Sequence, residues 1–308
     1  MTKTTTKSRP VEQPRPARSE VLVDPQWLTE HLADTRVRIV EVDVSPKAFA
    51  SGHIDGAVLW NIYTDLKGEN YEPVTKAAVE QLVATSGIKE DSTVVFYGYG
   101  PALGFWLMKL YGHRDVRMLD ASRDAWRAEG RPWTTEQPTP HRSTYRLPDE
   151  DDRLRATRAS VEREIDNPAS VVLDVRSRAE FRGERFWPSG GMEEGGRAGH
   201  VPGATSLTPD RLYDARGAFR TVPPRSTRSA IAPASTPPRP SGSSETELAQ
   251  AYEAVDLARS SIISYCTIGG RASTTWFVLT YLLGHDNVRV YDGSWAQWGR
   301  LADAPVEQ

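Results

Sequence analysis

The sequence predicts an α/β protein built from two tandem copies of one unit, each a parallel sheet flanked by helices. Two observations lead to this fold class. Short apolar runs typical of buried strands alternate with segments of helical character, and this alternation favours parallel strands joined by right-handed crossovers. The chain also repeats itself, because the same motifs follow in the same order in both halves.

The repeat can be followed element by element. Each copy contains a strand-like run, a Gly-His-x-x-Gly-Ala turn, a second strand, a helical segment, and a closing Gly-His-x-x-Val-Arg motif that precedes an Asp and a Trp. In the first copy these elements occupy residues 38–43, 52–57, 93–97, 105–111 and 112–126, and in the second they occupy 171–175, 199–204, 261–265, 276–283 and 284–298.

Composition sets the domain boundaries that we predict. Residues 1–19 are rich in Pro, Thr and basic residues, which predicts a disordered tail. The first copy spans 20–136, a polar linker covers 137–154, and the second copy spans 155–304. A segment rich in Pro, Ser and Arg, 220–244, interrupts the second copy. It is either a surface insertion or a basic arm that attracts an anionic substrate or docks a partner.

Bulk properties exclude several function classes. The net charge of −3 gives no reason to expect nucleic acid as a partner. No run approaches the roughly 20 apolar residues that cross a bilayer, and the N-terminus lacks the apolar stretch of a secretory signal, so we expect a cytoplasmic protein without membrane contact. One cysteine rules out an intrachain disulfide framework and a multi-cysteine zinc site, and we expect no metal and no cofactor.

The two copies serve as an internal control for candidate residues. A residue present in both is most simply explained by the shared fold, whereas a residue in one copy only is a better candidate for chemistry. The residues found in both copies are the histidine pairs of the turns and the closing tryptophans: His53 and His200, His113 and His285, Trp126 and Trp298. We therefore expect structural roles for them, which argues against a Cys–His hydrolase.

Cys266 has no such counterpart. It follows the apolar strand 261–265 and opens the loop Cys-Thr-Ile-Gly-Gly-Arg, whereas the first copy has Gly98 at the matching position and no arginine in its loop. A cysteine at a helix N-terminus tends to be a thiolate, and the thiolate is the nucleophile. Cys266 is therefore the predicted catalytic residue. The loop residues predicted to bind its substrate are Thr267, Ile268, Gly269, Gly270 and Arg271.

Arginines after the first strand of the second copy are further candidates. Arg176 follows the strand directly, at the carboxyl end where open α/β sheets bind ligands, and we predict that it contacts an anion. Arg178 is equally well explained by a solvated ion pair with a neighbouring carboxylate. The first copy has Asp43-Val-Ser-Pro at this place, without arginines.

Together these motifs resemble the rhodanese family, specifically its two-domain thiosulfate sulfurtransferases. The resemblance is carried by Asp174-Val-Arg176, the Gly199–Ala204 turn, the Cys266-x-x-Gly-x-Arg271 loop and the closing segment Tyr291–Trp298. It implies two tandem rhodanese-like domains, of which the first lacks the cysteine. It also implies that Cys266 carries sulfur as a persulfide and that Arg176 binds the anionic donor. Dual-specificity phosphatases of the same fold have five residues between Cys and Arg, whereas this loop has four.

The resemblance implies a thiosulfate:cyanide sulfurtransferase that works by double displacement. The sulfane sulfur of thiosulfate moves to Cys266, sulfite leaves, and cyanide in an assay or a thiol in the cell accepts the sulfur. Thr267 and Ile268 match neither the usual thiosulfate-type loop nor the mercaptopyruvate-type loop Cys-Gly-Ser-Gly, and the loop looks closest to an actinobacterial-like variant, Cys-x-Ile-Gly-x-Arg. Two alternatives stay open, a 3-mercaptopyruvate sulfurtransferase and a non-catalytic persulfide-relay module with a sulfur-acceptor protein as partner.

Overall fold

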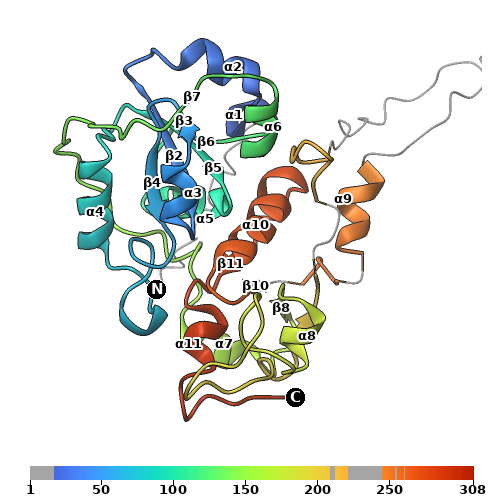
Figure 1. Ribbon diagram of the computed structural model, residues 1–308. Coiled ribbons are helices and arrows are strands. Elements are labelled where there is room, and N and C mark those ends of the chain that lie inside the picture. Colours follow the sequence, from blue (N-terminus) through green and yellow to red (C-terminus); the bar gives the residue numbers. More distant parts are fainter. Residues whose placement is uncertain (1–16, 209–211, 221–244, 254, 260) are drawn as a thin grey trace, which may run out of the picture.

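The computed structural model describes residues 17–208, 212–220, 245–253, 255–259 and 261–308. Within these ranges two all-parallel sheets form the centres of two units, an N-terminal one (blue to green) and a C-terminal one (yellow to red), as Figure 1 shows. The predicted α/β class with two parallel sheets is confirmed. Among the helices of the described residues, none is long and apolar enough to cross a membrane.

The N-terminal unit is built on five parallel strands in the order β1-β6-β5-β2-β4. These strands are β1 (Leu22–Val23), β2 (Val37–Asp43), β4 (Val58–Asn61), β5 (Thr93–Gly98) and β6 (Val116–Leu119). A small antiparallel pair, β3 (His53–Ile54) and β7 (Trp133–Thr134), accompanies them. The helices of this unit are α1 (Arg18–Val21), α2 (Pro25–His31), α3 (Pro46–Ala50), the 3₁₀ turn Glu69–Tyr71, α4 (Lys76–Thr85), α5 (Pro101–Leu110) and α6 (Arg123–Ala128).

The C-terminal unit is built on four parallel strands in the order β11-β10-β8-β9. These strands are β8 (Ser170–Asp174), β9 (Thr205–Ser206), β10 (Ser261–Tyr265) and β11 (Val288–Val290). Its helices are α7 (Arg158–Glu164), α8 (Arg178–Phe181), α9 (Glu245–Ala251), α10 (Gly270–Phe277), which continues as the π-helical segment Val278–Leu282, and α11 (Ser294–Trp298).

The two units share their strand order, so the repeat extends from sequence to topology. β11-β10-β8-β9 corresponds to β6-β5-β2-β4. The edge strand β1 has its counterpart in a parallel bridge between Arg155 and Val290, and the β3–β7 pair has its counterpart in an antiparallel bridge between His200 and Glu307.

The register of the strands changes the residue of the first copy that corresponds to Asp174, which the sequence comparison placed at Asp43. Glu41 lies opposite Tyr97 in the first sheet, and Asp174 lies opposite Tyr265 in the second. Because the two tyrosines occupy matching positions, the counterpart of Asp174 is Glu41 rather than Asp43.

The structure differs from one predicted boundary, the end of the N-terminal tail, because the first helix begins inside it. Arg18 begins α1, and its guanidinium binds the Asp120 carboxylate at 3.0 Å and the Phe219 carbonyl at 2.7 Å. Residues 17–19 therefore do not belong to the predicted tail. Residues 1–16, and 221–244 of the predicted insertion, lie outside the described residues. The linker 137–154 contains no helix or strand. The other boundaries stay predictions.

Alternate residues of the central strands face two different cores, as the two-residue period of a strand requires. On β5, Val94 and Phe96 join a large cluster that both units share, whereas Val95 and Tyr97 join a cluster of the N-terminal unit alone. On β10, Ile262 faces the shared cluster. Cys266, four residues later, belongs to the same cluster. The alternation thus turns the cysteine toward the N-terminal unit.

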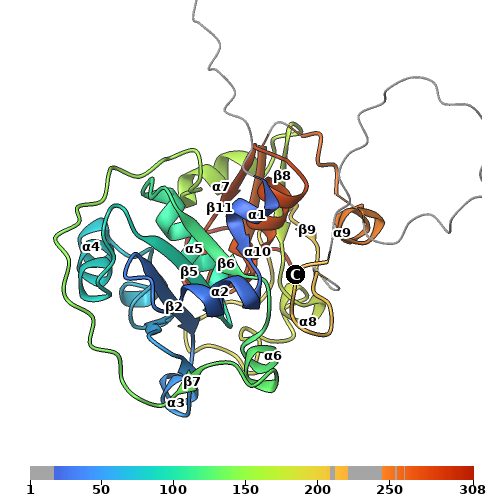
Figure 2. The ribbon, with the colours of Figure 1, turned by 90° about the horizontal axis from the view of Figure 1, so that it is seen from above.

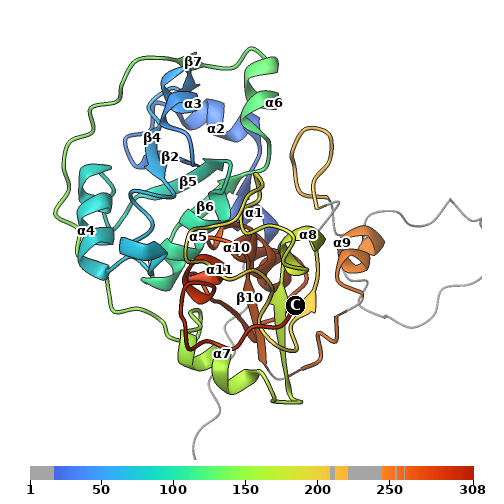
Figure 3. The same ribbon diagram turned by 60° about the horizontal axis from the view of Figure 1, so that its bottom comes forward.

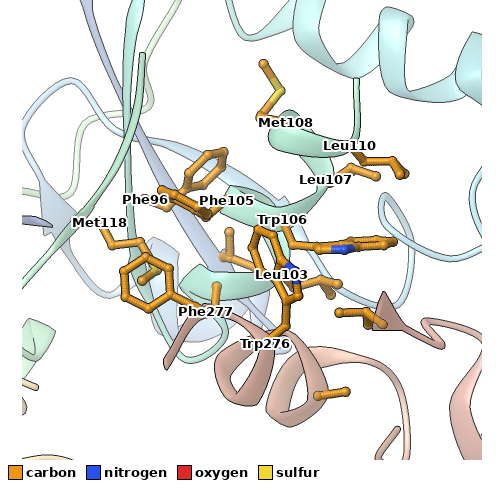
Figure 4. Close-up of a cluster of buried hydrophobic side chains, with 14 of the residues drawn as sticks. Phe96, Leu103, Phe105, Trp106, Leu107, Met108, Leu110, Met118, Trp276 and Phe277 are labelled. Carbon is orange, nitrogen blue, oxygen red and sulfur yellow. The ribbon is translucent and has the colours of Figure 1, made fainter. Parts of the chain in front are cut away.

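Helices α5 and α10 form the central contact between the units. Figure 4 shows Phe105 of α5 beside Trp276 and Phe277 of α10, and the Phe105 and Phe277 rings meet edge to face with centroids 5.0 Å apart. Figures 2 and 3 show α5 and α10 in the middle of the molecule, between α4 and α9 on opposite sides. Since burial of large apolar side chains is the main favourable term in association, this core fixes the two units against each other.

Candidate active site

Cys266 lies between the end of β10 and the start of α10, as the sequence predicts. Its side chain is buried, with 1% of the residue exposed. The backbone N–H of Gly269 donates to the Cys266 Sγ at 3.1 Å. Gly269 is the residue that caps the N-terminus of α10. The sulfur therefore sits where the unpaired amides and partial positive charge of a helix start favour an anion.

Helix α11 holds this loop from the other side. The amides of Trp295 and Ala296, in its first turn, donate to the carbonyl oxygens of Cys266 and Thr267 at 2.9 Å each. The N–H of Cys266 in turn donates to the Ser294 Oγ at 3.2 Å. The carbonyls of Cys266 and Thr267 are thus engaged by α11, while the Gly269 amide points at the sulfur. The closing segment, expected to be core only, thus also shapes the site.

Backbone conformation explains one of the two loop glycines. Gly269 has φ +97°, and a Cβ there would lie 3.2 Å from the Asp292 carbonyl oxygen and 3.4 Å from the Lys67 Nζ. Gly270 has an ordinary φ, and nothing lies within 4 Å of a Cβ added to it. Position 269 therefore requires glycine, whereas position 270 has room for a side chain.

Arg271 is paired with a carboxylate that the sequence analysis did not select. Its guanidinium donates to both carboxylate oxygens of Glu180, at 2.8 and 3.0 Å, and to the Thr267 Oγ1 at 2.7 Å. The Thr267 hydroxyl donates to the Glu180 Oε1 at 2.6 Å. The Glu180 side chain is fully buried, while that of Arg271 is 33% exposed. Glu180 therefore balances the charge of Arg271.

A local motif accounts for the position of Glu180. Ser177 caps α8, and the Glu180 carboxylate accepts the Ser177 N–H at 3.0 Å in a complete capping box. Burial by itself raises the pKa of Glu180, but the hydrogen bonds and charge of Arg271, with the bonds from Thr267 and Ser177, lower it overall to about 2. The Ser-x-x-Glu spacing is the signal that could have indicated this residue.

We expect Glu180→Gln to lower stability in a pH-dependent way. A carboxyl with a depressed folded-state pKa stabilises the fold above its ordinary value of 4.5, and this contribution is lost as the pH falls toward about 2. At pH 7 the free energy of unfolding should fall by about 1.5–3 kcal/mol, the scale of hydrogen bonds to charged groups. Urea unfolding at several pH values should show this difference shrink below pH 4.5. Glu184→Gln, on a carboxylate that is 59% exposed, is the control. A stability difference between the wild type and Glu180→Gln that stays constant down to pH 3 would contradict the assignment.

The structure places Arg176, which was predicted to contact an anionic donor, in the interior of the C-terminal unit. Its side chain is fully buried. The guanidinium donates to Asp174 at 2.6–3.0 Å and to the Gly199 carbonyl at 2.7 Å, and it lies over the Trp295 ring with 4.5 Å to the centroid. Because its charge is neutralised inside the core, this placement argues against contact with an anionic donor and for a structural role.

The remaining predicted residues are brought together in one loop. Thr267 and Ile268 are buried beside Cys266, at 1% and 9% exposed. The turn histidines take the structural roles expected of them. His53 stacks on Phe49 at 3.8 Å, and His200 stacks on Phe181 at 3.6 Å. The Nδ1 of each lies 3.0 and 2.9 Å, respectively, from the carbonyl oxygen of the same phenylalanine.

One residue of the N-terminal unit also reaches this loop. The Nζ of Lys67, a residue only 5% exposed, donates to the Asp292 carbonyl oxygen at 2.5 Å. The carboxylate of Asp292 meets Arg155, with 3.2 Å between Oδ1 and Nε. Comparison of the two copies points to residues of the second copy that the first lacks, so it gives no signal for a lysine that lies in the first.

Comparisons with known proteins show the family of this chain. The family described as the rhodanese-like domain matches the chain twice, over residues 24–129 and 157–301. The chain is 35% identical over 304 residues to the "Sulfur carrier protein TtuD" of Thermus thermophilus, covering 94% of this chain and 97% of that one. It is also 35% identical over 302 residues to the "Putative thiosulfate sulfurtransferase" of Mycolicibacterium smegmatis, covering 94% and 99%.

Solved structures agree on the fold. The Tum1 protein of Saccharomyces cerevisiae matches with a TM-score of 0.71 and 19% identity, covering 92% of this chain and 96% of that one. An anaerobic ergothioneine biosynthesis enzyme of Chlorobium limicola matches with a TM-score of 0.76 and 19% identity, covering 94% and 71%. At these identities the likeness concerns the fold alone.

Proposed function

Because the chain belongs to the rhodanese-like domain family and is a sulfurtransferase in class, we propose that it moves the sulfane sulfur of thiosulfate to a thiophilic acceptor. Cys266 carries the sulfur as a persulfide. The acceptor is cyanide in an assay and a thiol, free or on a protein, in the cell. The reducing cytoplasm is the compartment in which such a thiol stays available.

In the first step the Cys266 thiolate attacks the outer sulfur of thiosulfate. A bond forms between Sγ and that sulfur, the sulfur–sulfur bond of thiosulfate breaks, and its electron pair leaves with sulfite. The product is a Cys266 persulfide. No proton moves in this step, so the site needs no general base.

In the second step the acceptor attacks the outer sulfur of the persulfide. With cyanide a carbon–sulfur bond forms, the bond to Sγ breaks, and its electron pair returns to Cys266 as thiolate while thiocyanate leaves. The enzyme is thereby regenerated, and the two half-reactions are expected to give ping-pong kinetics.

The observation that carries this proposal is the amide of Gly269 directed at Sγ at the start of α10. Fixed N–H groups and a helix N-terminus stabilise a negative charge on sulfur in both the thiolate and the persulfide. Thr267, Ile268, Gly270 and Arg271 complete the proposed substrate loop.

The loop provides few charged contacts that would select one anionic donor. The side chain of Ile268 offers an anion no polar contact, and the Arg271 charge is balanced by Glu180. 3-Mercaptopyruvate therefore remains the alternative donor. A persulfide relay that receives sulfur from another protein is the second candidate function, because the relative from Thermus thermophilus is named a sulfur carrier.

A comparison of donors tests the proposal. Steady-state rates of thiocyanate formation are measured with thiosulfate and with 3-mercaptopyruvate, at a fixed concentration of cyanide. We expect a kcat/KM at least about tenfold higher for thiosulfate, a difference of about 1.4 kcal/mol in transition-state binding. A preference for mercaptopyruvate would reassign the donor. No turnover with either, together with transfer from a persulfide protein, would favour the relay.

A further inference from the structure

The charges around Cys266 can be assigned to partners one by one. Arg271 forms a two-point ion pair with Glu180. Arg155 pairs with the Asp292 carboxylate through its Nε at 3.2 Å and its Nη2 at 3.3 Å, and with Glu150 at 2.5 Å. Each arginine thus already has a carboxylate as its counter-charge.

Lys67 differs from these arginines. Its ammonium donates to the Asp292 backbone carbonyl, which is a neutral group, and none of the ion pairs found among the described residues includes it. A charge held in the interior without an opposite charge is costly. Two groups near Lys67 can carry a negative charge, the Asp292 carboxylate and the sulfur of Cys266. The Asp292 carboxylate is already paired with Arg155, which leaves the sulfur as the group whose charge has no partner yet.

The geometry connects Lys67 to that sulfur through a single residue. A Cβ added to Gly269 would lie 3.4 Å from the Lys67 Nζ. The backbone amide of the same glycine donates to the Cys266 Sγ. Leu66, the neighbour of Lys67, is packed in the core that both units share with Cys266. Lys67 also forms a backbone bridge to Pro73, which fixes the start of its side chain.

We propose that Lys67 is the counter-ion of the Cys266 thiolate and of the persulfide that replaces it, so that the N-terminal unit supplies one charge of the active site. The inference rests on the proposed function in that Cys266 is taken as the sulfur-carrying thiol. It gives the unit that lacks a cysteine a direct part in the chemistry.

Electrostatics agree with this role. Burial lowers the pKa of Lys67, whereas Asp292 and Cys266 act to raise it and Arg155 lowers it further. Arg271 also interacts with Cys266. An ammonium whose pKa is depressed by burial is stabilised when the neighbouring sulfur is negative, so the charges on Lys67 and Cys266 support each other.

The test measures the pH dependence of Cys266 alkylation in the full-length protein. Iodoacetamide reacts with the thiolate, and the adduct is followed by mass spectrometry from about pH 5 to 9. Lys67→Gln removes the charge but keeps a donor for the Asp292 carbonyl. Lys67→Arg keeps the charge. Lys109→Met is the matched control, because Lys109 is a partly buried lysine whose ammonium also donates to a backbone carbonyl, that of Arg114, at 2.6 Å.

The midpoint of the alkylation profile of Lys67→Gln should lie about one pH unit higher than that of the wild type. At pH values below both midpoints the variant should be alkylated about tenfold more slowly, since one unit there changes the thiolate fraction tenfold. Lys67→Arg and Lys109→Met should keep the wild-type midpoint. A Lys67→Gln profile that superimposes on that of the wild type would overturn the proposal.

Near-UV circular dichroism checks the fold of each variant. Lys67→Met, which keeps the length of the side chain, is a second variant that removes the charge. The alkylation profile is taken from the variant, Lys67→Gln or Lys67→Met, that keeps the native spectrum. Alkylation needs no sulfur donor, so a negative result for Lys67 leaves the proposed function standing. Failure of the proposed function would instead appear as wild-type protein that gains no sulfur mass with thiosulfate.

Discussion

Cys266→Ser should lose sulfur transfer by a factor of at least about 10³, the scale on which removal of a nucleophile is felt. A serine hydroxyl is not ionised near neutral pH, so it cannot attack the sulfane sulfur as the thiolate does. The fold should persist, because the hydroxyl is close in size to the thiol and can still accept the Gly269 N–H.

Two measurements check this result. Thiocyanate formation from thiosulfate and cyanide should fall to background in Cys266→Ser. Mass spectrometry after incubation with thiosulfate should show about one added sulfur on the wild type and none on the variant. Because Cys266 is the chain's single cysteine, the added mass has no other thiol to occupy. Full activity in the serine variant would refute the mechanism.

Arg176→Met should lower the free energy of unfolding by about 3–5 kcal/mol, the cost of breaking a buried ion pair from one side. The substitution leaves Asp174 buried with its carboxylate deprived of the guanidinium, although the Tyr265 hydroxyl still donates to it at 2.6 Å. It also removes a donor to the Gly199 carbonyl and a cation from the face of Trp295.

Urea unfolding measures this loss, and Arg178→Met is its control because Arg178, two residues away, is exposed. The control should change stability by less than about 0.5 kcal/mol, as surface substitutions usually do. The KM for thiosulfate separates a structural role of Arg176 from the predicted contact with the anionic donor. An Arg176→Met protein of wild-type stability with a raised KM for thiosulfate would restore Arg176 as a donor contact.

Periodicity and repetition made much of the fold predictable from the sequence. Apolar runs such as 93–97 and 261–265 became the central strands β5 and β10, because a strand buried on both faces has few alternatives. Comparison of the copies assigned His53 and His200 to turns, where both bind backbone carbonyls. Cys266 and its loop lie between strand and helix as predicted, since strand, glycine and helix start are consecutive in the chain.

The partners of the charged groups were not predictable in the same way. Arg176 and Arg271 are both arginines near the carboxyl ends of neighbouring strands, yet one is neutralised in the core by Asp174 and the other meets Glu180 near the surface. Which carboxylate an arginine meets depends on the loop and helix that follow each strand, and on residues about 90 positions apart in the chain.

The sequence by itself therefore determined that Cys266 stands as a lone thiol at the start of a helix, because strand, loop and helix are local features written in consecutive residues. The tertiary structure decided what surrounds that thiol. α5 packs on α10, and Lys67 of the N-terminal unit reaches the carbonyl of Asp292 beside the loop of that cysteine. The charge of an active site is set by what lies close in space, and proximity across two units follows from packing rather than from sequence order.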